Sequence, residues 1–359
     1  MSALLAALRH DDHKLGRLVR STSGVSLWCD ALTAFSYRFG DSIPETWVRK
    51  PGDVTEWYLD VLRACSRLEQ VDVFFSTKRL CDLCLRALSS SFGSLNKIHF
   101  YPDPEAAQGT PLDLPTAFKI MRLRLPQTLA EATFDSLNWL PGSGTDSSEL
   151  PFAVSNLTVS PRWRSSLDVL SFLPSPSAVP PLQSFDASLA SGGACQAVPT
   201  LRRIAQRVGA SLRKLHFVFP TTSGSPSLHE YRAVTANFHL PLDPAFPFPQ
   251  LVHLALNRCC SLSLRFLESL ASSSPLLETI EFYESSWTPD PGSTNLVDDE
   301  RFEPRLIVGL RKFARLRSVA LGTLPTVSEC AYPTLIATFA ALGVEVGFQT
   351  CVDSDLSEE

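Results

Sequence analysis

The stretch Leu251-Val252-His253-Leu254-Ala255-Leu256-Asn257-Arg258-Cys259 holds the pattern that decides the fold of this 359-residue chain. Its apolar residues Leu251, Leu254 and Leu256 are separated first by two residues and then by one. The same three-part apolar phrase recurs through most of the sequence. It is found at Leu68/Val71/Val73, Leu95/Ile98/Phe100, Leu129/Ala132/Phe134, Val154/Leu157/Val159, Leu182/Phe185/Ala187, Leu212/Leu215/Phe217, Leu277/Ile280/Phe282 and Leu316/Val319/Leu321.

Successive phrases begin 25 to 39 residues apart, and the mean of about 31 is near the period of repeat proteins that pair a strand with a helix. The spacers carry apolar residues at helical intervals, as in Leu80, Leu83, Cys84, Ala87 and Leu88. Each unit therefore predicts a strand, a turn and a helix. Further helices are expected over residues 56–67, 163–172, 199–208, 262–271, 302–313 and 332–342, and a last strand over 342–348.

The unit that starts at Leu251 continues with Cys259, Leu262, Leu267 and Leu270, and it resembles the cysteine-containing type of leucine-rich repeat. Repeats of this type occur in F-box proteins, and the irregular, proline-interrupted units here are similar to those of fungal F-box/leucine-rich-repeat proteins. The resemblance implies a substrate receptor of a cullin-RING ubiquitin ligase, attached through an adaptor by an F-box. No recognisable F-box, which usually opens with a Leu-Pro pair, precedes Leu15.

The pattern predicts the fold class and its division along the chain. One strand with one helix cannot bury its own apolar face, whereas a stack of such units shares a continuous core. We therefore expect an α/β leucine-rich-repeat solenoid, a horseshoe with a parallel concave sheet, outer helices and irregular repeats of about 25–39 residues. Residues 1–50 are expected to form an N-terminal cap or degenerate first repeat, 51–350 the solenoid, and 351–359 an acidic disordered tail.

Composition limits the partners and the compartment. Apolar residues make up 44% and charged residues 19% of the chain, which is typical of a folded soluble protein, and the net charge of −5 argues against nucleic acid as a partner. No apolar run approaches the roughly 20 residues of a membrane-spanning helix, so no membrane partner is expected. The nine cysteines and the short apolar run after Met1 suit a protein that is not exported. We predict a cytoplasmic or nuclear location.

The residues with the most reactive side chains all have a structural interpretation. Cys81 and Cys84 have the spacing of half a zinc site, but no second pair follows, and Cys84 belongs to an apolar helical stripe. His10 and His13 are interpreted as parts of a solvated turn. We find no glycine-rich phosphate loop and no nucleophile elbow. The chain is thus expected not to be an enzyme and to have no catalytic, metal-ligating or cofactor-binding residues; a hydrolase or thiol enzyme on an irregular α/β fold is the alternative.

The residues that alternate with the buried positions of the strands are the expected partner-binding surface. Successive strand side chains point to opposite faces, so these residues should face solvent on the concave sheet. Exposed rings flanked by polar groups suit protein recognition. The sequence predicts a non-enzymatic protein-binding module, with a generic scaffold or regulator without a ligase link as the alternative. The predicted partner-binding residues are Asp72, Phe74, His99, Tyr101, His216, His253, Asn257, Glu281 and Tyr283.

Overall fold

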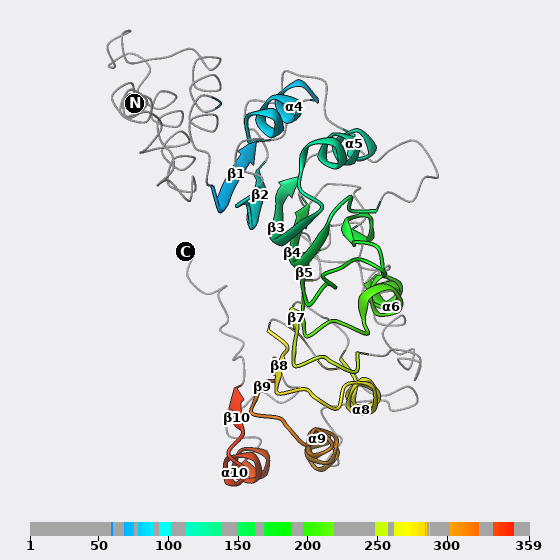
Figure 1. Ribbon diagram of the computed structural model, residues 1–359. Coiled ribbons are helices and arrows are strands. Elements are labelled where there is room, and N and C mark those ends of the chain that lie inside the picture. Colours follow the sequence, from blue (N-terminus) through cyan, green and yellow to red (C-terminus); the bar gives the residue numbers. More distant parts are fainter. Residues whose placement is uncertain are drawn as a thin grey trace, which may run out of the picture. The chain divides into compact units, whose positions relative to one another are not determined.

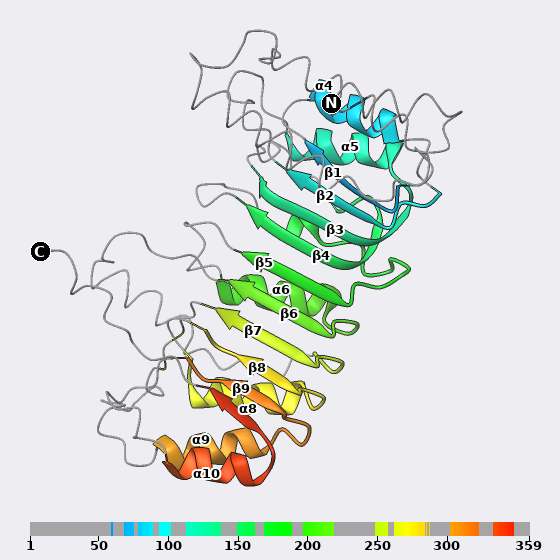
Figure 2. The same ribbon diagram turned by 90° about the vertical axis from the view of Figure 1, so that its left-hand side faces the viewer.

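The computed structural model describes two compact units, which divide between Pro180 and Pro181. The first contains strands β1 to β4 and the second contains strands β5 to β10. In each unit the helices lie on one side of the strands (Figures 1 and 2). The described residues are 59, 68–74, 78–88, 93–101, 113–137, 149–161, 169–188, 197–218, 248–257, 262–283, 285, 287, 302–322 and 333–347.

The ten strands are all parallel, and within each unit neighbours in the sheet follow the order of the chain. This confirms the prediction of an α/β fold in which helices connect parallel strands. The strands are β1 (Gln70–Phe74), β2 (Lys97–Tyr101), β3 (Thr128–Leu137), β4 (Ala153–Pro161), β5 (Ser184–Ser188), β6 (Lys214–Val218), β7 (His253–Asn257), β8 (Thr279–Glu281), β9 (Ser318–Ala320) and β10 (Glu345–Gly347). The helices are α4 (Lys78–Ala87), α5 (Leu114–Arg124), the 3₁₀ helix η3 (Val169–Phe172), α6 (Ala197–Val208), α8 (Leu264–Ser273), α9 (Phe302–Arg311) and α10 (Pro333–Ala341).

The recurring apolar phrase supplies the core of both units. Every phrase residue whose side chain the structure describes is buried, none being more than 8% exposed. The central residues of successive phrases are also paired directly across the strands. In the first unit these partners are Val71, Ile98, Ala132 and Leu157; in the second they are Phe185, Leu215, Leu254, Ile280 and Val319, followed by Val346. Register follows the phrase because a slip of one residue would turn these side chains to the opposite face.

A hydrogen-bond pattern at the start of the strands repeats in both units. The carbonyl oxygen of Gln183 accepts hydrogen bonds from two consecutive amides of the next repeat, Arg213 at 2.7 Å and Lys214 at 3.0 Å. This paired acceptance joins a strand to the strand before it at six places, whereas the carbonyls of Gln127 and Arg317 each accept one such amide, from Ala153 and Glu345. The carbonyls that accept two amides in this way belong to Glu69, Asn96, Gln183, Arg213, Val252 and Glu278.

Aromatic side chains fill the space between strands and helices. In the first unit Phe134 stacks on Phe100 at a centroid distance of 4.5 Å and lies 5.0 Å from Phe172, whose ring meets Phe118 edge-on. In the second unit the ring of Trp287 is 5.9 Å from that of Phe282. Each such ring buries a large apolar area, so every unit has its own aromatic core.

The helices begin and end close to their predicted bounds, with differences that have local causes. Helix α8 begins at Leu264 and not at Leu262, because the Ser263 side chain accepts a hydrogen bond from the Phe266 amide and caps the helix. Only residues 169–172 of the helix expected over 163–172 are described, and they form the short 3₁₀ helix η3. Helix α5 is not among the helices predicted above; it begins after the Asp113 cap, and Pro115 lies in its first turn.

Several predictions lie outside the described residues. They include the cap at 1–50, the acidic tail at 351–359, most of the helix at 56–67, and the side chains of Cys81 and Cys84. Among the described helices, none is both long enough and apolar enough to cross a membrane.

Candidate functional site

The candidate site is the face of strands β5 to β8 that points away from the helices, in the second unit. We call it the open face and define it by Asp186, Lys214, His216, His253, Ala255, Asn257 and Glu281. These residues alternate along their strands with the buried phrase residues, so they share one side of the sheet. Figure 2 shows these four strands side by side, with α6 and α8 behind them.

Three side chains on adjacent strands form a hydrogen-bonded relay. Nδ1 of His216 on β6 lies 2.9 Å from Oδ2 of Asp186 on β5, and Nε2 of the same ring lies 2.8 Å from Nδ2 of Asn257 on β7. These contacts fit a neutral imidazole that carries its hydrogen on Nδ1, donates it to the carboxylate, and accepts from the amide. Both ring nitrogens of His216 are therefore engaged within the protein.

The two histidines of the open face are perturbed in opposite directions. The hydrogen bond to Asp186 raises the pKa of His216 above its ordinary value, although burial opposes the change, and the charges of Asp186 and Glu281 add to the increase. Burial lowers the pKa of His253, and the nearby charges of Lys214 and His216 act in the same direction against Glu281. The pKa values of two neighbouring imidazoles are thus moved apart.

Ala255 differs from its expected environment. Its position on β7 places it with the solvent-facing residues, yet it is only 2% exposed. The register puts it between His216 on β6 and Glu281 on β8, while His253 and Asn257 flank it on its own strand. A single methyl group among four longer side chains is covered by them, which explains the burial.

The five predicted residues of the second unit all lie on or beside the open face. His216, His253, Asn257 and Glu281 belong to it, and Tyr283, just after β8, is 47% exposed. Asp186 and Lys214 were not among the predicted site residues. The signal that finds Asp186 is its position between the buried Phe185 and Ala187 of one phrase.

The four predicted residues of the first unit lie on β1 and β2. The register pairs Asp72 with His99 and Phe74 with Tyr101. His99 is half-buried, whereas the side chains of the other three lie outside the described part of the chain. On the same face Lys97 forms an ion pair with Glu131 of β3 at 2.8 Å.

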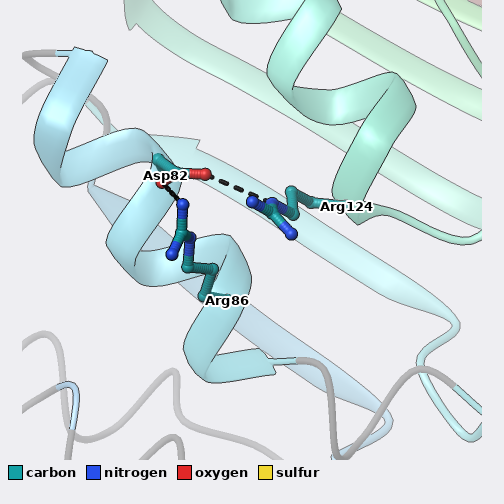
Figure 3. A network of polar contacts seen from close by, with 3 residues as sticks. All are labelled: Asp82, Arg86 and Arg124. Atoms are coloured by element: carbon teal, nitrogen blue, oxygen red, sulfur yellow. Dashed lines mark hydrogen bonds and ion pairs between the residues drawn. The ribbon is translucent and has the colours of Figure 1, made fainter.

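A second polar network lies on the helical side of the first unit (Figure 3). Asp82 of α4 contacts Arg86 one turn further along at 2.7 Å and Arg124 at the end of α5 at 3.2 Å. Burial acts to raise the pKa of Asp82, but the hydrogen bonds and charges of the two guanidinium groups outweigh it and lower the pKa. These contacts join two helices, and we interpret them as structural.

His216 is poorly placed to act as a general base. A general base needs a free lone pair within reach of its substrate, and both nitrogens of His216 are engaged by Asp186 and Asn257. Within the described ranges no group of three His, Cys, Asp or Glu side chains could hold a metal ion. A scan of the chain against models of known protein families finds no match, and a search among curated proteins finds none either.

Proposed function

We propose that this chain is a non-enzymatic protein–protein interaction module, built as a leucine-rich-repeat solenoid whose open strand face binds a protein partner. The repeating units support the solenoid: the same buried phrase and the same paired carbonyl contact recur from strand to strand. Stability that comes from neighbouring repeats leaves one strand face available for a partner.

One observation carries the binding proposal: polar side chains and an exposed ring lie together on parallel strands whose backbone is fixed by hydrogen bonds. The relay of Asp186, His216 and Asn257 holds three of these side chains in place before a partner arrives. A preorganised surface loses less conformational entropy on binding. The exposed ring of Tyr283 lies at the margin of the open face and adds aromatic area. Tyrosine is enriched among the residues that contribute most to binding at protein interfaces.

The more specific form of the proposal is a substrate receptor of a cullin-RING ubiquitin ligase. It depends on the resemblance of the Leu251 unit to the repeats of F-box proteins. A generic scaffold or regulator has the same binding face but no ligase link. Mixing the purified full chain with the cullin adaptor, followed by gel filtration, separates these two functions, because only the ligase receptor would co-elute with the adaptor.

The protein-binding proposal is tested by proximity labelling in cells with the full chain. The double variant His253→Ala/Tyr283→Ala removes an imidazole and a ring from the open face and its margin, and we expect it to lose the labelled proteins that the unchanged chain enriches. The matched control is Arg265→Ala/Val308→Ala, which changes exposed residues of α8 and α9. Equal labelling by both variants would refute binding at the open face.

A further inference from the structure

The side-chain amide of Asn257 has a hydrogen-bond partner at one end only. Its Nδ2 lies 2.8 Å from Nε2 of His216, whereas its Oδ1 is buried and has no hydrogen-bond donor among the residues that the structure describes. The two ends of a carboxamide have nearly the same size and can exchange places by rotation about one side-chain bond. Since either orientation leaves one end without a partner, the contact with His216 decides between them.

The favoured orientation of this amide depends on the protonation of His216. A neutral imidazole with its hydrogen on Nδ1 has a lone pair on Nε2, which accepts a hydrogen bond from Nδ2 of Asn257. An imidazolium ion carries hydrogens on both nitrogens and has only donors. Two N–H groups would then face each other across the 2.8 Å contact. This unfavourable contact is removed when the amide turns Oδ1 toward the ring.

The surroundings of His216 allow it to take up a proton. Its side chain is 34% exposed and that of Asp186 is 42% exposed, so water reaches both without any opening of the sheet. The hydrogen bond from Nδ1 to Oδ2 of Asp186, at 2.9 Å, raises the pKa of His216 above its ordinary value of about 6.5, although burial opposes the change. His216 therefore binds a proton at a higher pH than an ordinary histidine.

The charged or titratable described groups that face His216 are Asp186 on β5, Lys214 on its own strand, His253 on β7 and Glu281 on β8. The charges of Asp186 and Glu281 favour the imidazolium ion. Burial lowers the pKa of His253, so His216 is the first of the two histidines to bind a proton as the pH falls. The proton is thus taken up next to Asn257.

We propose that His216 and Asn257 form a proton-driven switch, in which proton uptake at Nε2 of His216 turns the Asn257 amide over so that Oδ1 accepts a hydrogen bond from the new N–H. The step takes one proton from water and breaks no covalent bond. One N–H···N hydrogen bond is replaced by an N–H···O bond that is stronger because its donor is charged. The switch adds a positive charge to the open face. It goes beyond the proposed binding function, because it operates in the chain without a partner.

The experiment is an NMR pH titration of the ¹⁵N-labelled full chain, observed at the imidazole nitrogens of His216. Asn257→Leu removes the amide but keeps a side chain of similar size. If the amide turns over, this variant lacks the acceptor that stabilises the imidazolium ion. The pKa of His216 should then fall, and its acid dissociation constant should become about three- to tenfold larger. The matched control Gln206→Leu removes an exposed carboxamide from α6 and should leave the titration unchanged.

The opposite sign would overturn the switch. An amide that kept Nδ2 toward the ring would oppose protonation, so its removal would raise the pKa of His216; a rise, or no change, in the folded Asn257→Leu variant contradicts the proposal. Circular dichroism establishes that each variant is folded.

A second measurement uses the unchanged chain. A ¹⁵N–¹⁵N coupling between Nδ2 of Asn257 and Nε2 of His216 should be present above the pKa of His216 and disappear below it, where the Nε2–H signal should stay protected from exchange with water. Coupling at both pH values or at neither, or an unprotected Nε2–H, would reject the switch. Neither measurement involves a partner, so its rejection would leave the proposed binding function to the labelling experiment.

Discussion

At position 322 both the backbone conformation and the surrounding atoms require a glycine. It follows β9 with a φ of +68°, and an added Cβ would lie 2.5 Å from the carbonyl oxygen of Ser285 and closer still to that of Phe282. Gly322→Ala should therefore lower the free energy of unfolding by about 2 kcal/mol or more. Gly343 has a similar φ of +70° but open space around it, so Gly343→Ala should cost only about 1 kcal/mol. Urea denaturation compares the two, and equal losses would contradict the steric argument.

The imidazole of His216 gives the second prediction at this scale. Because its pKa is raised in the folded state, its contribution to stability is full below the ordinary histidine pKa of about 6.5 and is lost as the pH rises through the folded value. Asp186→Asn removes the carboxylate whose hydrogen bond is the main cause of the raised His216 pKa. The variant should be less stable than the unchanged chain by up to about 1 kcal/mol at pH 6, and the difference should shrink by pH 8.5. A difference that stays constant between these pH values, followed by urea denaturation, would show that the pair is not proton-linked.

At the scale of elements, Asp82 joins α4 to α5 through Arg86 and Arg124. Its lowered pKa means that its contribution is present above the ordinary aspartate pKa and disappears as the pH falls through the folded value. Asp82→Asn should destabilise the chain at pH 7 by under about 1 kcal/mol, since the pair is partly exposed, and this effect should shrink as the pH is lowered below the ordinary aspartate pKa. Glu268→Gln, which breaks the longer 3.4 Å contact with Lys312, should have a smaller effect at pH 7. The reverse order would contradict this interpretation.

The sequence predicted the repeated elements well because their signals are local. The phrase around Leu215 and Leu254 marks both the strands and their register, and these residues are buried as expected. The relay could not be predicted in the same way. His216 finds Asp186 thirty residues before it and Asn257 forty-one residues after it. These contacts depend on register and on side-chain geometry across three strands, which no short pattern encodes.

At the scale of the whole molecule, each strand shares buried partners with the strands beside it. Ile280 is fully buried and pairs with Leu254 on one side and Val319 on the other. Ile280→Asp places an unpaired carboxylate in this core, and such a burial costs several kcal/mol. We expect this variant, like Leu254→Asp, to lose its far-ultraviolet circular dichroism and cooperative unfolding. Val308→Asp on the exposed side of α9 is the control, and a folded Ile280→Asp variant would contradict the shared-core model.

The carbonyls that each accept two amides lie at the start of strands and not at their end. Inserted residues should therefore disturb the start of such a strand more than its end. Arg213 holds the amides of Val252 and His253 in this way, so a single residue inserted between them would break the clamp and reverse every side chain of β7. Sequence added after Val218, where β6 has ended, would leave all of these contacts intact. Protein engineering can therefore lengthen the connection that leaves β6, whereas the step from Val252 to His253 at the start of β7 must keep its residue count.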